Sequence, residues 1–123
     1  MRLLAALGCI LLGACSTTGS TDSVAFYHPP VGSNLVLEGP IAAAPGHHMV
    51  VGDLVATPGM VIPRHSHSGE EFLYVMGGSG TVSIDGKPDV LLKAGQGLRI
   101  APGEVHGGTA GPEGMRAVSS WVV

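Results

Sequence analysis

Residues 59–78 read GMVIPRHSHSGEEFLYVMGG, and this stretch decides how the chain should fold. Alternate residues of a strand point to the same face, so His65 and His67 can face one ion. The following Ser68-Gly69 is a turn signal, which lets the chain re-enter the sheet with Glu71 beside the two histidines. The stretch therefore predicts two strands joined by a tight turn, with three metal-type ligands close together.

A fourth candidate ligand, His106, lies far downstream after Pro102-Gly103 and would join a second strand to the same site. Imidazole with one carboxylate suits Fe, Mn, Ni, Cu or Zn, whereas Ca and Mg prefer oxygen ligands. Glu70 competes with Glu71 for the carboxylate position, and we favour Glu71 because it shares a face with the apolar residues 73 and 75. The residues thus predict one divalent transition metal held by His65, His67, Glu71 and His106.

Short apolar runs alternate with turn residues along most of the chain, and helical periodicity is nearly absent. Asp85-Gly86 is a strong hairpin signal between two of these runs. Many short strands, in a sequence with 20 glycines, indicate an all-β sandwich or barrel. The runs lie at 49–55, 71–76, 80–84, 90–93, 98–101 and 115–123.

The spacing of glycine, HxH, glutamate and closing glycine over 59–78 resembles the first motif of the cupin family in full. The second cupin motif is matched in part, with three positions in register: Gly95, Gly103 and His106. Three other positions depart from it: Gln96, Ala101 and Ala110. These departures fall at turn positions and not at ligand positions.

The resemblance implies an all-β double-stranded β-helix, or jelly-roll, with a metal inside the barrel near one mouth. By position, the family's ligands are His65, His67, Glu71 and His106. On a six-coordinate metal, four protein ligands leave about two positions open for water, dioxygen or a bidentate substrate. We therefore expect a metal-dependent enzyme for a small organic molecule, of the dioxygenase, isomerase or decarboxylase type. In such an enzyme Glu71 could leave the metal and act as a base.

Two other functions remain open: a non-catalytic protein that holds a metal or small ligand, and a structural role in which the metal only joins strands. The direction of the side chains in the run at 98–101 discriminates among these functions. An inward Arg99 would favour substrate binding, whereas inward Leu98 and Ile100 would form a hydrophobic cup.

The first residues resemble a bacterial export signal, with Arg2, an apolar run over 3–12, and then Gly13-Ala14-Cys15. Residues 12–15 resemble a lipoprotein box, which implies that Cys15 carries lipid; the alternative is an ordinary secretory signal cut near Ala14. We expect a signal peptide at 1–14, a lipid-anchored flexible lead-in at 15–34 and a cupin barrel domain at 35–123. The protein would then be a periplasm-facing envelope lipoprotein, at the outer membrane, attached by its lipid alone.

The formal net charge of −3 argues against a nucleic-acid partner, because phosphate binding needs a basic patch. We expect a small-molecule ligand or substrate instead. Phe72, Tyr74 and Met76 alternate away from Glu71 and are expected to pack on a neighbouring sheet or on a second subunit of a homodimer. Trp121 is interpreted as core or dimer packing. His47-His48 is either an exposed strand start or a proton shuttle at the barrel mouth.

Overall fold

The computed structural model describes residues 26–123, and the regular elements in this range are all β-strands. Within it, no helix is long and apolar enough to cross a membrane. The expected signal peptide, Cys15 and the first part of the lead-in lie outside the described residues. The strands are β1 (Gly32–Pro40), β2 (His48–Ala56), β3 (Val61–His65), β4 (Glu71–Ile84), β5 (Val90–Lys93), β6 (Gly97–Ile100) and β7 (His106–Val122).

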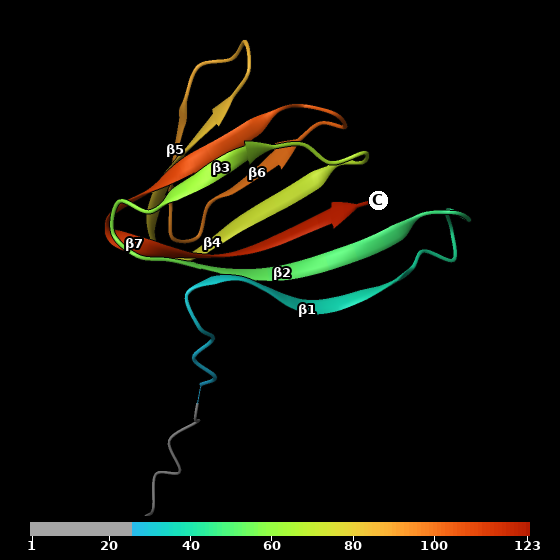
Figure 1. Cartoon of the computed structure of the whole chain (residues 1–123), viewed down its shortest axis with the longest axis horizontal. Coiled ribbons are helices and arrows are strands. Elements are labelled where there is room, and N and C mark those ends of the chain that lie inside the picture. The colour runs from blue at the N-terminus through green and yellow to red at the C-terminus, as the bar shows by residue number, and fades with distance from the viewer. Residues whose placement is uncertain (1–25) are drawn as a thin grey trace, which may run out of the picture.

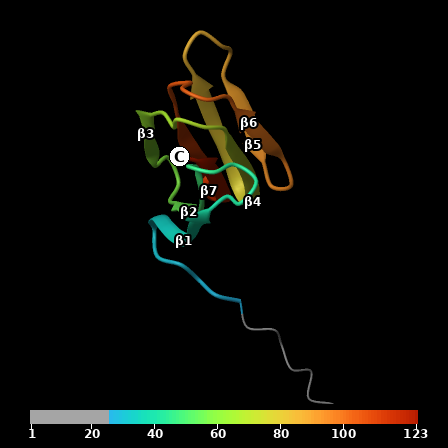
Figure 2. The same cartoon turned by 90° about the vertical axis from the view of Figure 1, so that its right-hand side faces the viewer.

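Strands β4 and β7 organise the fold, because they pair antiparallel with each other along almost their whole length. The early part of β4, 71–78, pairs with 115–121 of β7, and the later part, 80–84, pairs with 106–110. One layer contains β1, β2, late β7, early β4 and β6, and the other contains β3, early β7, late β4 and β5. Figures 1 and 2 show these layers wrapped around a common interior. This arrangement is the expected double-stranded β-helix.

Glycine lets the two long strands bend from one layer into the other. The register of β4 against β7 shifts between Val75 and Gly77 and again between Gly78 and Gly80. Gly78 has a φ of +67°, and a Cβ at this position would overlap the backbone oxygen of Gly114. Gly114 itself has a φ of +80°. Only glycine adopts these conformations without strain, so the closing glycine of the 59–78 stretch marks the bend of the barrel.

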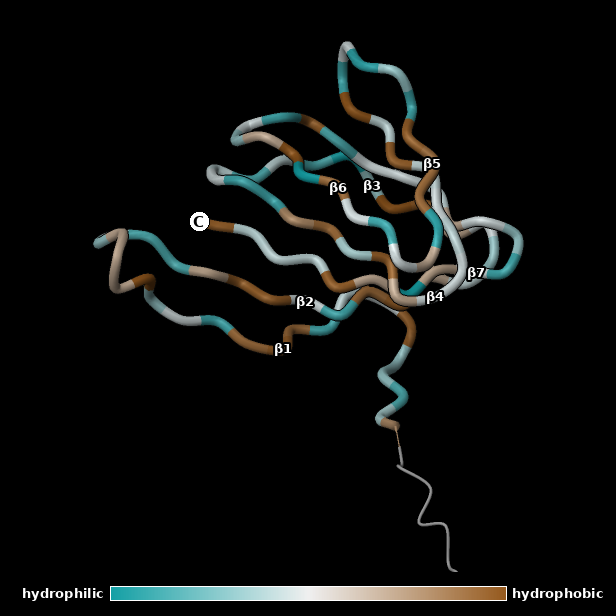
Figure 3. Tube along the Cα trace, turned by 180° about the vertical axis from the view of Figure 1, so that it is seen from behind, coloured by the Kyte–Doolittle hydropathy of each residue, from teal (hydrophilic) through white to brown (hydrophobic). Residues whose placement is uncertain are grey.

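The structure joins elements that the sequence pattern separated. The runs at 71–76 and 80–84 form one bent strand, β4, and the run at 115–123 extends back to His106 as β7. Within residues 26–123, strand β1 pairs only with β2 and is an edge of the sheet. It begins at Gly32, close to the start of the barrel domain expected at residue 35. Its apolar run, 35–37, is exposed and is drawn in brown in Figure 3.

Alternation along β4 and β7 separates an apolar interior from an outer surface. Val75 and Ala117 are fully buried, and burial of apolar side chains is the main stabilising contribution to such a core. Their core neighbours are Ala56, Leu73, Val82, Ile84, Leu92, Ile100, Ala110 and Met115. The intervening residues of β4, Phe72, Tyr74 and Met76, are exposed. The expectation that they pack on a neighbouring sheet is therefore wrong within this chain, because they face away from the other layer.

Candidate metal centre

The four candidate ligands lie at the ends of strands. His65 is the last residue of β3, Glu71 is the first of β4, and His106 is the first of β7. His65 and His106 face each other as partners in the β3–β7 ladder. His67 follows in the connection between β3 and β4, so the two histidines do not alternate along one strand as the spacing predicted. The chain leaves β3 after His65 and returns through Gly69, whose N–H donates to the carbonyl of Val122.

Ligand atoms from these four residues lie within 4.8 Å of one another. Oε2 of Glu71 is 3.3 Å from Nε2 of His67 and 2.8 Å from Nε2 of His106. Donor atoms bound at about 2.1 Å to one ion lie about 3–4 Å apart, and the two distances from Oε2 of Glu71 are close to this spacing.

Two backbone carbonyls fix the imidazole tautomers. Nδ1 of His65 lies 2.8 Å from the carbonyl oxygen of Pro63, and Nδ1 of His106 lies 2.8 Å from that of Glu104. A carbonyl oxygen only accepts hydrogen bonds, so each Nδ1 carries the proton and each Nε2 presents a lone pair. Such backbone contacts fix the orientation of metal-binding histidines.

Two hydrogen-bond acceptor atoms at the centre of the cluster face each other without a donor between them. Oε2 of Glu71 and Nε2 of His106 are buried and have no hydrogen-bond partner among residues 26–123, although they lie 2.8 Å apart. Two lone pairs at this distance repel each other, and buried polar atoms are normally satisfied. A divalent cation would satisfy both atoms at once. The residues therefore fit a transition metal with nitrogen and oxygen ligands.

Two residues of β7 contact the candidate ligands and fix their orientation. Oγ of Ser119 donates a hydrogen bond of 2.5 Å to Oε1 of Glu71, which leaves Oε2 facing the histidines. The Trp121 ring stacks on His67, with ring centroids 4.8 Å apart and 24° between the planes. Burial lowers the pKa of His67 against the opposing effect of the Glu71 carboxylate, which favours the neutral imidazole that binds a cation.

The hydrogen-bond role of Ser119 was not predicted from the sequence, and Trp121 was interpreted as packing. Parity contains the missing signal: Met115, Ala117, Ser119 and Trp121 alternate along one face of β7. Because Met115 is buried, every second residue after it should also face the interior, and this would have placed the Ser119 hydroxyl and the Trp121 indole beside the ligands.

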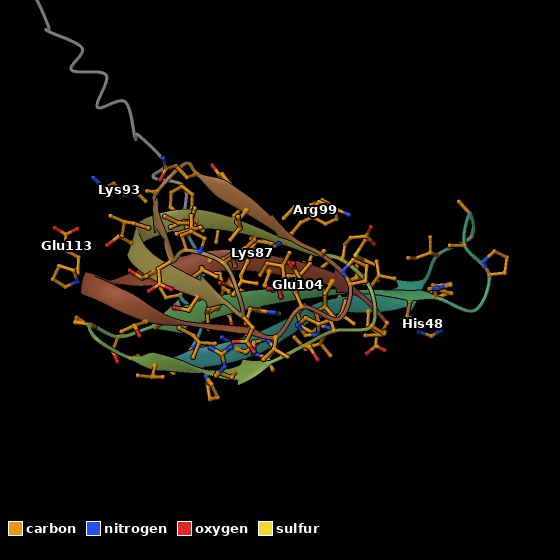
Figure 4. All side chains as sticks on the ribbon, turned by 90° about the horizontal axis from the view of Figure 1, so that it is seen from above. His48, Lys87, Lys93, Arg99, Glu104 and Glu113 are labelled. Atoms are coloured by element: carbon orange, nitrogen blue, oxygen red, sulfur yellow. The ribbon has the colours of Figure 1, made fainter. Side chains whose placement is uncertain are left out.

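The turn before His106 is held by an ion pair. Glu104 accepts a 3.0 Å hydrogen bond from the Ala101 N–H and pairs with Lys87, which also lowers the pKa of the Glu104 carboxyl. Figure 4 shows Lys87 and Glu104 close together near the middle of the molecule. Ala101 is one of the departures from the second motif, and its N–H is what this carboxylate binds.

A cavity of about 330 Å³ opens beside the cluster. The titratable residues in its wall are His65, Glu71 and His106, and the hydroxyl residues are Ser33, Thr81 and Ser119. The rest is apolar or backbone: Leu54, Ile62, Pro63, Leu73, Val82, Ile100, Gly107, Gly108 and Met115. The cavity is thus a hydrophobic cup with the metal ligands on one side.

Several polar candidates lie away from the cluster. Arg99 is exposed and donates a 2.9 Å hydrogen bond to Glu70, which lowers the pKa of that carboxyl. Glu70 therefore faces outward while Glu71 is buried. His47 and His48 are both exposed. Nδ1 of His48 lies 3.8 Å from Oε1 of Glu38 on β1. Figure 4 shows His48 on the β1–β2 hairpin, far from Glu104, so the proton-shuttle position is not supported.

Comparison with known proteins identifies the family of this chain. Residues 52–121 match the family model of the cupin domain, and the chain belongs to this family. Over 74 residues it is 43% identical to dimethylsulfoniopropionate lyase DddW of Ruegeria pomeroyi, which covers 60% of this chain and 47% of that protein. The chain thus spans about half the length of that lyase.

Two solved structures are also similar. A Klebsiella pneumoniae protein with a double-stranded β-helix domain aligns with a TM-score of 0.60 and 28% identity, over 81% of this chain and 90% of the other. A cupin-like protein from Thermotoga maritima aligns with a TM-score of 0.56 and 34% identity, over 59% and 56%.

Proposed function

We propose that this protein is a metal-dependent enzyme acting on a small organic molecule. The observation that carries the proposal is the convergence of unpaired acceptor atoms, Oε2 of Glu71 and Nε2 of His106, next to an apolar cavity. The ligands would be His65, His67, Glu71 and His106, around one Fe, Mn, Ni, Cu or Zn ion. When bound, the ion would supply Lewis acidity that polarises a substrate oxygen.

The reaction we propose is proton abstraction beside that oxygen function, as in an elimination or an isomerisation. The similarity to a lyase supports this class, and Glu71 is the carboxylate that lines the cavity. Glu71 would leave the metal and accept the proton from carbon on Oε2, while Ser119 holds its Oε1. In an elimination, the C–H electron pair forms the new double bond and the leaving group departs with its bonding pair. An apolar wall excludes water from the reacting carbon.

Elemental analysis of the full chain, purified without chelator, tests the metal proposal. We expect close to one transition-metal ion per chain in the wild type and loss of it in His65→Ala and His106→Ala. Turnover of candidate hydroxy acids with and without added metal then tests catalysis, and oxygen uptake identifies a dioxygenase. A wild type that folds normally but takes up no metal would contradict the proposal.

A non-catalytic binding protein is the second candidate. The observation that favours it is the absence, within the cavity wall of the described residues, of charged side chains other than the metal ligands. Such a wall offers few groups for acid–base chemistry. Tight binding of small acids to the metal-loaded protein, with no turnover of any, would support this candidate over the enzyme.

We further propose that the protein is an envelope lipoprotein, anchored through lipid on Cys15. The support comes from the residues around Cys15 alone, which resemble a lipoprotein box. Mass spectrometry of the N-terminal peptide from membranes tests this. We expect an acylated Cys15, and an unmodified N-terminus would contradict it.

We also propose a homodimer in which a second copy covers the exposed row Phe72, Tyr74 and Met76. Three large apolar side chains on one strand form the kind of patch that marks an interface, and the row can meet its own copy about a two-fold axis. Light scattering should give the mass of two chains for the wild type and of one for Tyr74→Glu. A monomeric wild type would contradict this.

A further inference from the structure

The charged side chains around the cavity point away from it. On β6, Arg99 is exposed and pairs with Glu70 at 2.9 Å, whereas the next residue, Ile100, is 2% exposed and lines the cavity. This settles the choice between an inward arginine and a hydrophobic cup in favour of the cup. The strand that could have offered a cation to a substrate therefore offers a branched alkyl group.

Strands β2 and β7 also carry a charged residue outside the cavity next to an apolar residue that lines it. Arg116 of β7 makes two hydrogen bonds, of 3.2 and 2.8 Å, to the carboxylate of Asp53, and neither residue lines the cavity. Their neighbours along the chain, Met115 and Leu54, do line it. At these positions of β2 and β7, the charged side chain lies outside the cavity wall and its apolar neighbour lies in it.

From this wall, and resting on the proposed function, we infer the substrate class: a small molecule with one metal-directed oxygen group and an uncharged, apolar body. The body would lie against six side chains: Leu54, Ile62, Leu73, Val82, Ile100 and Met115. A charged group on the body would lose its hydration without gaining a partner, which is strongly unfavourable. One neutral oxygen on the body is compatible, because the Thr81 hydroxyl also lines the cavity.

The inference separates this protein from its relative. Dimethylsulfoniopropionate carries a carboxylate and a permanent sulfonium cation, and a carboxylate bound toward the metal would place the sulfonium against the apolar wall. A hydrophobic wall contributes to binding in proportion to the apolar area that it covers. The substrate should therefore resemble that molecule at the carboxylate end and differ from it by a neutral far end.

Three hydroxamic acids with the same metal-binding group test the class. Butanohydroxamic acid has a neutral tail, 4-aminobutanohydroxamic acid a cationic tail, and succinic acid monohydroxamate an anionic tail. We expect calorimetry on the zinc-loaded full chain to show at least tenfold tighter binding of the neutral probe than of either charged probe.

A pair of adjacent residues provides the matched variants. Ile62→Glu places a carboxylate in the wall, whereas Val61→Glu places one on the exposed neighbour, which is 65% exposed. We expect the cationic probe to gain affinity at least tenfold in Ile62→Glu and to be unchanged in Val61→Glu. If circular dichroism shows that Ile62→Glu is unfolded, Leu54→Glu replaces it.

The outcomes distinguish this inference from the proposed function. If a charged probe binds the wild type as tightly as the neutral one, the substrate class is overturned while the metal site stands. If the chain retains zinc but binds none of the three probes, no coordination position is open, and both the inference and the proposed enzyme are overturned.

Discussion

The inner and outer faces of β4 and β7 carry different chemistry on the same backbone. On β4 the inner row is Glu71, Leu73 and Val75, and the outer row is Phe72, Tyr74 and Met76. On β7 the inner Ser119 bonds to Glu71, whereas its neighbour Ser120 is partnered with Phe72 in the ladder. Because side chains alternate across a strand, moving one position along the chain exchanges a site residue for a surface residue. Adjacent residues are therefore natural controls for each other.

The largest difference should appear between Glu71→Gln and Glu70→Gln. Removing the Glu71 charge takes away the only anionic ligand of the described cluster, so we expect loss of bound metal and at least about a 100-fold weaker affinity. Glu70 lies on the outer face and pairs with Arg99, so its variant should keep the wild-type metal content. Equal metal loss in the two variants, measured by elemental analysis, would refute the assignment.

The next largest difference should appear in the free energy of unfolding, between Leu73→Ala and Phe72→Ala. Leu73 is 8% exposed and Phe72 is 51% exposed. Leu73→Ala should cost about 2–5 kcal/mol of the free energy of unfolding, because it leaves a cavity. Phe72→Ala should cost less than about 1 kcal/mol, and its cost should depend on protein concentration if the outer row forms the proposed dimer. Urea titration of the apo chains at two concentrations measures both; a larger loss for Phe72→Ala would reverse the assignment of the faces.

Ser119→Ala and Ser120→Ala should differ in metal affinity and less in stability. Without the hydroxyl, Oε1 of Glu71 is no longer held and the carboxylate can rotate, so we expect about 10–100-fold weaker metal binding. The visible spectrum of the cobalt-loaded chain should also change, because the ligand geometry changes. Ser120→Ala should leave both unaltered, and Ser119→Thr should restore most of the affinity. An unchanged spectrum in Ser119→Ala would show that the serine only packs.

The smallest effect should come from the outer ion pair. Arg99 and Glu70 have exposed side chains, and such pairs contribute less than about 1 kcal/mol. We expect Arg99→Gln to leave metal content unchanged and to lower stability by less than that amount, with the difference vanishing in high salt. A large loss of metal in this variant would show that the outer face supports the site after all.

Much of this comparison could be predicted from the sequence, since period-two alternation placed Glu71 inward and Phe72, Tyr74 and Met76 outward. The motif spacing also identified the four residues that the structure brings together. Alternation failed where the chain leaves the sheet: His67 reaches the cluster from a connection and not from β3. It also could not carry through the Pro102-Gly103 turn, so the direction of Arg99 stayed open. The bond from Ser119 to Glu71 depends on the register of β4 against β7, in which Glu71 faces Trp121 and Leu73 faces Ser119. Parity along β7 gives the face of Ser119 but not this register.

One strand also determines when the site can exist. Strand β7 begins with His106 and carries Ser119 and Trp121 near its other end, and Trp121 pairs with Glu71, which lies 50 positions earlier in the sequence. The centre is therefore complete only after a strand pairing between residues far apart in the sequence has formed, and such pairings form slowly in folding. A metal that binds so late should slow unfolding and leave the folding rate almost unchanged. Stopped-flow measurements of the folding and unfolding rates with and without metal would show this. The lifetime of the folded protein would then depend on the concentration of available metal.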